Sequence, residues 1–69
     1  MTATQIRDCL EALIAPVRVS DLWTTPMGIT ADVPAFIGDE KQSPIAHATG
    51  ARKVDLIRYS DRTLVFLEM

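Results

Sequence analysis

The C-terminal part of the chain carries the pattern that most restricts the fold. Residues 53–59 and 62–68 are two runs rich in β-branched, aliphatic and aromatic residues, and they flank the dipeptide Ser60-Asp61. Two such runs around a two-residue loop predict a β-hairpin, so the fold must contain antiparallel strands. Because Ser-Asp is not the preferred pair for a two-residue loop, a longer loop with a shifted register is the alternative.

A two-residue loop places Tyr59 opposite Arg62 and fixes the pairing of the two strands. One face then holds the pairs Val54–Leu67 and Leu56–Val65, and the other holds Lys53–Glu68, Asp55–Phe66 and Ile57–Leu64. The first face is apolar and is expected to join the core. The second face is mixed, and it exposes Ile57, Leu64 and Phe66 unless a helix of the same chain covers it.

Residues 2–15 are predicted to form an amphipathic helix. Apolar residues recur there at the spacing of one helical face: Ile6, Cys9, Leu10, Leu13 and Ile14. Thr2 and Gln5 fit a capping box, and Pro16 disfavours helical backbone at the residue before it. The stripe therefore indicates a helix with one buried face, on which Cys9 is a core residue.

Shorter elements are predicted between the helix and the hairpin. They are a strand at 17–19 and helices near 20–25, 32–37 and 43–49, each helix opened by a capping residue and limited by Pro or Gly. Trp23 is interpreted as a core residue beneath the first of these helices. The elements together predict one α+β domain over residues 1–69, since a chain this short holds a single core.

Charge is distributed unevenly along the chain. The net charge is -2, from seven Lys and Arg against nine Asp and Glu. Residues 1–40 contain two basic and six acidic side chains, whereas residues 41–62 contain five basic and two acidic ones. The second segment therefore suggests a basic face.

Several function classes find little support in the sequence. Cys9 is the only cysteine and His47 the only histidine, which leaves no zinc-ligand spacing, and no third group is evident to orient a Ser43–His47 pair. The glycines are scattered, so no phosphate-binding loop is present. We therefore expect a protein that is not an enzyme and that needs no cofactor or metal.

Apolar stretches, cysteine content and the N-terminal sequence together indicate the cellular compartment. The longest uncharged stretches have ten residues, well short of the roughly 20 that a membrane-spanning helix needs. No internal disulfide can form from one cysteine, and the N-terminus lacks the features of a signal peptide. The expected location is the cytoplasm, without a membrane partner.

The predicted order of elements resembles the winged helix-turn-helix family of DNA-binding proteins. The resemblance is carried by the helix at 2–15, the link 16–19, Ser20-Asp21-Leu22 opening a second helix, the turn Gly28-Ile29-Thr30, and residues 52–68 as the wing. Pro26 departs from the pattern, because it lies where the family's second helix usually continues.

The resemblance implies a regulator of transcription or replication that binds double-stranded DNA. A helix would enter the major groove, and the hairpin would contact the backbone or the minor groove. The residues expected to reach base edges are Ser43, His47 and Thr49, and those expected to contact phosphates are Arg52, Lys53, Arg58 and Arg62. Dimerisation would assist a chain whose net charge is negative.

The alternative is a small protein-interaction module, such as an inhibitor or adaptor of the kind that phage genes encode. Residues 63–67 are apolar on both faces and end the chain as a possible edge strand, which could pair with another chain. Self-pairing would give a homodimer, and the expected interface residues are Ile57, Leu64 and Phe66.

Overall fold

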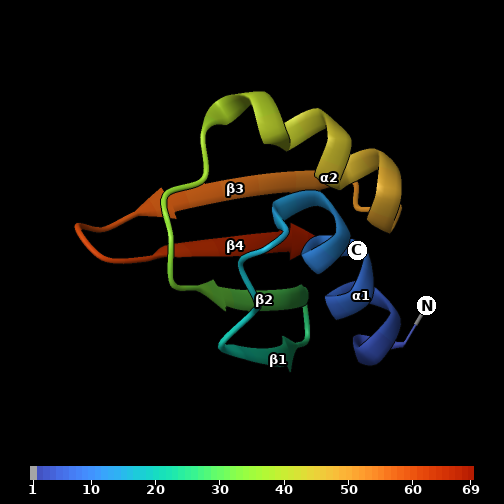
Figure 1. Ribbon diagram of the computed structural model, residues 1–69. Helices are drawn as coiled ribbons and strands as arrows, with labels where there is room; N and C mark the ends of the chain where they lie inside the picture. The colour runs from blue at the N-terminus through green and yellow to red at the C-terminus, as the bar shows by residue number, and fades with distance from the viewer. Residues whose placement is uncertain (1) are drawn as a thin grey trace.

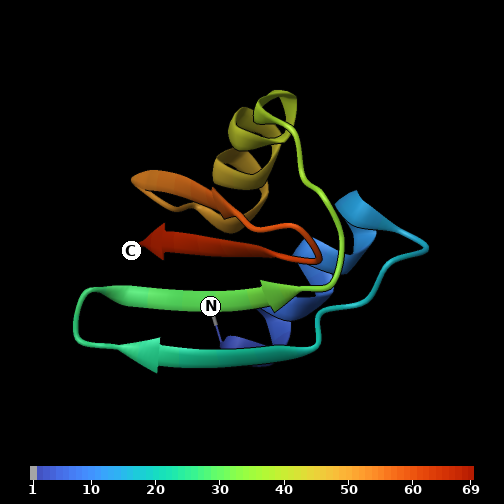
Figure 2. The ribbon, with the colours of Figure 1, turned by 90° about the vertical axis from the view of Figure 1, so that its left-hand side faces the viewer.

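The computed structural model describes residues 2–69 and confirms the α+β class. The elements are α1 (Ala3–Ile14), β1 (Asp21–Thr25), β2 (Gly28–Val33), a short 3-10 helix η1 (Asp39–Lys41), α2 (Gln42–Thr49), β3 (Lys53–Arg58) and β4 (Thr63–Glu68). The strands form one antiparallel sheet in the order β1-β2-β4-β3. Both helices pack on the same face of this sheet (Figures 1 and 2), which we call the covered face. Within residues 2–69 no helix lies on the opposite face, which we call the open face.

Helix α1 agrees with the sequence pattern. The capping box is present, because the Thr2 N–H donates to Gln5 Oε1 at 2.7 Å and the Gln5 N–H donates to Thr2 Oγ1 at 3.2 Å. These bonds satisfy backbone donors that the first helical turn leaves free. Ile6 and Leu10 are fully buried against the sheet, and the helix ends one residue before the Ala15-Pro16 pair.

The C-terminal hairpin has the register that the two-residue loop predicts. Val54 pairs with Leu67, Leu56 with Val65, and Ile57 with Leu64. Its place in the sheet differs from the expectation, however, because β4 lies between β2 and β3. The interpretation of the C-terminal strand as an edge strand is therefore wrong: pairing with β2 occupies the side on which a partner would have joined.

The helices predicted near 20–25 and 32–37 are wrong, since β1 and β2 form a second hairpin and residues 34–37 after β2 form an irregular link. Trp23, Thr24 and Thr25 are residues that favour strands, and Pro26 with Met27 forms the turn. A Cβ at Gly28 would collide with the Leu67 backbone carbonyl, so only glycine fits where β2 passes β4 at this point.

The segment before β1 also differs from the prediction. The strand predicted at 17–19 is an irregular link, because its backbone pairs with no strand: the Val19 N–H donates to Glu11 Oε2 at 2.9 Å instead. Pro34, which cannot donate to a ladder, ends β2. Two segments that carry the winged-helix resemblance, 20–22 and 28–30, thus lie in strands, and the resemblance itself stays a prediction.

Helix α2 covers the predicted segment 43–49 and ends at Gly50, whose left-handed backbone (φ 74°) glycine adopts readily. Ile45 is fully buried in the core, and the Thr49 hydroxyl donates to its carbonyl at 2.7 Å. Ser43 and His47 lie on the exposed side of the helix.

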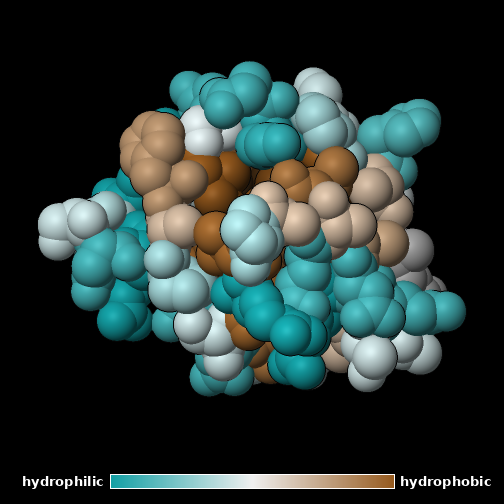
Figure 3. Space-filling model, viewed as in Figure 1, coloured by the Kyte–Doolittle hydropathy of each residue, from teal (hydrophilic) through white to brown (hydrophobic). Residues whose placement is uncertain are grey.

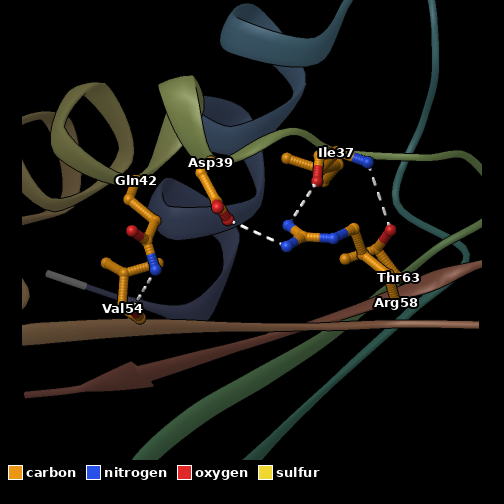
Figure 4. A network of polar contacts seen from close by, with 6 residues as sticks. All are labelled: Ile37, Asp39, Gln42, Val54, Arg58 and Thr63. Atoms are coloured by element: carbon orange, nitrogen blue, oxygen red, sulfur yellow. Dashed lines mark hydrogen bonds and ion pairs between the residues drawn. The ribbon is translucent and has the colours of Figure 1, made fainter.

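Polar contacts hold the link between β2 and α2 against the sheet (Figure 4). The buried Thr63 hydroxyl donates to the Ala35 carbonyl at 2.7 Å and accepts from the Ile37 N–H at 3.2 Å. Arg58 donates to the Ile37 carbonyl at 2.9 Å and lies 2.9 Å from an Asp39 carboxylate oxygen. These bonds satisfy backbone groups of a segment that has no strand partner.

Candidate interaction surface

The open face is a regular surface because the strands alternate their side chains between the two sides of the sheet. Its central row consists of Trp23, Thr30, Phe66 and Asp55, one from each strand. A second row consists of Asp21, Asp32, Leu64 and Ile57, and a third of Thr25, Gly28, Glu68 and Lys53. The residues between them in sequence, such as Ala31 and Val65, point to the covered face and are fully buried.

Large apolar side chains of the open face lie on the interior strand β4 and on both edge strands, β1 and β3. Trp23 is 42% exposed and Ile57 is 43% exposed, and Leu64 and Phe66 are half-buried beside them. Thr30 is only 3% exposed although no helix covers it, because it lies between Trp23 and Phe66 on the neighbouring strands. The apolar side chains thus extend across the sheet from β1 to β3, with Thr30 between Trp23 and Phe66.

Trp23 is the residue of this surface that the sequence interpretation missed. The prediction of a core tryptophan beneath a helix is wrong, because β1 turns the indole onto the open face. The signal was present in the sequence: Trp23, Thr24 and Thr25 together favour a strand. In a strand, Trp23 lies on the opposite side from the half-buried Leu22.

Carboxylates lie among the apolar side chains of the open face. The open-face positions of the four strands contain four carboxylates and one ammonium group: Asp21, Asp32, Asp55, Glu68 and Lys53. Lys53 lies 3.8 Å from Asp55, and Arg62, from the loop before β4, lies 3.2 Å from Asp32. No basic side chain within 4.0 Å of Asp21 or Glu68 occurs in the part of the chain that the structure describes.

Two depressions mark the open face. One, of about 550 Å³, lies between Trp23, Tyr59 and Leu64 at the end of the sheet near the β3–β4 loop. The other, of about 750 Å³, is lined in part by Ile57, Phe66 and the turn residue Met27. Both are shallow and apolar in part.

The covered face also retains a small opening. A hollow of about 200 Å³ lies between the end of α1 and the link that contains Phe36 and Ile37. Figure 3 shows apolar side chains at the surface in the middle of this face, between hydrophilic areas. The Phe36 ring, 75% exposed, lies over the Arg58 guanidinium at 5.4 Å and is thus already engaged within the molecule.

The residues predicted to reach DNA bases do not share one surface. Ser43 and His47 are exposed on α2. Thr49 is 2% exposed, and its hydroxyl donates to the Ile45 carbonyl and accepts from the Ala51 N–H. Thr49 therefore has a structural role at the end of the helix and is not available to a base edge.

The cations predicted to contact phosphates are mostly paired with carboxylates. Lys53 lies on the open face beside Asp55, and Arg58 reaches to the covered side, where it meets Asp39. Arg62 lies between two carboxylates, those of Asp32 and Asp61, at 3.2 and 3.5 Å. Arg52 is exposed, and no carboxylate lies within 4.0 Å of it in residues 2–69. The basic segment of the sequence therefore does not form one basic surface.

The residues predicted for a protein interface are brought together. Ile57, Leu64 and Phe66 occupy adjacent positions of β3 and β4 on the open face. Within residues 2–69 no group of three or more His, Cys, Asp and Glu side chains is arranged to hold a metal ion. Neither helix in that range has the length and apolar character needed to cross a bilayer.

Comparison of the chain with protein-family models, with curated proteins and with solved structures finds no match. Function must therefore be inferred from the chemistry of the surface itself.

Proposed function

We propose that the protein is a non-catalytic protein-binding module that receives a polypeptide on its open face. The observation that supports this is the set of large apolar side chains, Trp23, Ile57, Leu64 and Phe66, on a sheet face that no helix of residues 2–69 covers. Accessible aromatic and aliphatic side chains that share one surface are typical of protein interfaces. An inhibitor or adaptor would use such a face.

The charge of the open face favours a partner with basic residues. No basic group lies within 4.0 Å of the Asp21 or Glu68 carboxylate in residues 2–69, and Asp55 is more than half exposed. Lysine or arginine side chains of a partner would meet these carboxylates while an apolar residue of the partner covers Phe66. Duplex DNA would face the same carboxylates with its phosphates, so protein binding is the better-supported function.

The test uses Phe66→Asp with Phe36→Asp as the matched control. Both variants replace a phenylalanine that no helix covers by aspartate, but Phe36 lies in the link before α2, away from the open face. Peptides selected from a displayed random library on the wild-type protein are titrated into both variants by calorimetry. We expect the Phe66→Asp variant to lose at least about tenfold in affinity and the Phe36→Asp variant to keep it.

Two further measurements decide the chemistry of the partner. Replacing the Lys and Arg residues of a selected peptide by Gln should weaken its binding, and added salt should do the same. The proposal fails if Phe36→Asp weakens binding as much as Phe66→Asp does. It also fails if duplex DNA binds instead, with an affinity that falls steeply with salt and is lost when Arg52 and Lys53 are changed to Glu.

A further inference from the structure

The two edges of the sheet differ in how they are covered. Helix α2 lies along β3 (Figure 1), and the Gln42 side chain donates from Nε2 to the Val54 carbonyl at 3.1 Å. Figures 1 and 2 both show β1 as the outermost strand, with no element beyond it in the plane of the sheet. The β1 edge is therefore the one at which a further strand can be added.

The registers fix which backbone groups of β1 point outward. In an antiparallel ladder the N–H and C=O of one residue point to the same side, and those of the next residue point to the other. The Tyr59 N–H donates to the Arg62 carbonyl at 2.8 Å, which sets this alternation in the β3–β4 pair. The registers carry the same alternation from β4 to β2 and from β2 to β1. The N–H and C=O groups of Leu22 and Thr24 therefore point away from β2.

Two hydrogen bonds agree with this assignment. The Ser20 N–H donates to the Asp32 carbonyl at 2.8 Å, so Asp32 faces β1 as the alternation requires. The Leu22 N–H donates to Asp21 Oδ1 at 2.8 Å, a side-chain acceptor outside the ladder. In residues 2–69 no group outside the β1–β2 pair bonds to the Leu22 carbonyl or to the N–H and C=O of Thr24.

We propose that β1 pairs antiparallel with β1 of a second copy of this chain, across a two-fold axis at Trp23. This inference goes beyond the proposed function, because it uses the strand edge rather than the open face. Leu22 of each copy lies opposite Thr24 of the other, so the outward groups of both residues bond reciprocally. In the dimer the Leu22 N–H donates to the Thr24 carbonyl of the second copy instead of to Asp21 Oδ1, and water solvates the Asp21 carboxylate.

The sequence of β1 is complementary to itself in this register. The pairs are Trp23 with Trp23, Leu22 with Thr24, and Asp21 with Thr25, each taken across the axis. The two Asp21 carboxylates are thus placed at opposite ends of the pair and do not face each other, which avoids repulsion between like charges. Strand β1 contains no Lys or Pro, residues that often block such pairing at an edge.

The size of the contact defines what kind of dimer is expected. Strand β1 has five residues, so the pairing covers less surface than the roughly 1,200 Å² of a stable complex. The dimer is therefore weak and depends on concentration. Because the axis is perpendicular to the sheet, the two open faces lie on the same side and form one surface of eight strands.

The first test compares Thr24→Pro with Thr24→Ala. Proline removes an outward N–H that makes no bond within the sheet, and alanine keeps it. Sedimentation velocity from micromolar to millimolar concentration should show dimerisation of the wild-type protein and of Thr24→Ala, with dimerisation of Thr24→Pro weakened by at least about tenfold. In the wild type, the amide NMR signals of Leu22 and Thr24 should shift with concentration more than those of β3.

A second pair tests the register without proline. Thr25→Lys places an ammonium group opposite Asp21 of the second copy, and Thr25→Asp places a carboxylate there. Both lose the same hydroxyl bonds to Gly28, so they are matched in their effect on the turn. Since each contact occurs twice, we expect Thr25→Lys to dimerise about two- to thirtyfold more tightly than Thr25→Asp.

Three outcomes would overturn the dimer: no association at millimolar concentration, association that Thr24→Pro leaves unchanged, or Thr25→Asp dimerising as tightly as Thr25→Lys. Association that Phe66→Asp abolishes and Thr24→Pro does not would assign the contact to the open face and also overturn this proposal. Failure of the dimer would leave peptide binding on the open face untouched, because Thr24 points away from that face.

Discussion

The two faces of the sheet share the same four strands and differ in what their side chains do. On the covered face, Val33 and Val65 are fully buried beneath α1 and α2, and Leu67 is 2% exposed. On the open face, Trp23 and Ile57 retain more than two fifths of their surface in contact with solvent. The covered face thus supplies the apolar burial that stabilises the fold, and the alternation of strand residues leaves the open face available for another molecule.

The largest expected difference comes from removing a side chain that packs on the covered face. Leu10→Ala should lower the free energy of unfolding by about 2–5 kcal/mol, because Leu10 is fully buried and a cavity remains. Urea denaturation measures the change. Leu13, half-buried on the same helix, is the control, and Leu13→Ala should cost less. A loss below about 1 kcal/mol for Leu10→Ala would mean that α1 does not anchor the covered face.

Two threonines, one on each face of the sheet, test the same comparison with a smaller expected change in stability. Thr63 lies on the covered face and bonds through its hydroxyl to Ala35 and Ile37. Thr63→Val should cost about 1–3 kcal/mol, because it leaves a buried carbonyl and N–H without partners. Thr30, equally buried on the open face, makes no side-chain hydrogen bond to residues 2–69, and Thr30→Val should change stability by less than about 0.5 kcal/mol.

Equal costs for the two threonine variants in thermal or chemical denaturation would contradict the assignment of Thr63 as the residue that holds the link before α2. Far-UV circular dichroism of both variants is the control for the sheet itself.

The smallest effect is expected for a polar substitution on the open face. Ile57→Thr should change the free energy of unfolding by no more than about 0.5 kcal/mol, since the side chain is already 43% exposed. Val54→Thr, on the same strand but on the covered face, places a hydroxyl in the core and should cost about 1–3 kcal/mol. Equal values for the two variants would show that the faces do not differ as described.

The sequence predicts the parts of the fold in which local pattern and local geometry agree. The stripe from Ile6 to Ile14 produces α1, and the two-residue loop sets the pairing of β3 with β4. The β1–β2 hairpin was not predicted because Ser20, Pro26 and Gly28 are residue types that occur both at helix ends and in hairpin turns. The strand preference of Trp23 and its neighbours is the information that separates the two.

The order of the strands could not be predicted from local pattern. Strand β4 pairs with β2, thirty to forty residues earlier in the chain, and this contact makes β4 an interior strand. Long separations in sequence also explain why the ion pairs of the cations were not predicted. Arg62 meets Asp32 and Arg58 meets Asp39, partners that a count of charge along the chain does not reveal.

The candidate interface was predictable in part. Ile57, Leu64 and Phe66 follow from the hairpin register alone, because a register assigns every side chain to one face. Trp23 completes the surface only when β1 joins the sheet, which requires the long-range pairing of β2 with β4. The surface is thus a property of the assembled sheet rather than of one segment.

Trp23 is also the only tryptophan of the chain. Its fluorescence emission therefore reports on the solvent at one place, where the outermost strand meets the open face, without an attached dye. A bound peptide or a second copy at that edge would shield the indole from a dissolved quencher such as iodide. A titration followed by quenching would thus register occupancy directly in the unmodified protein.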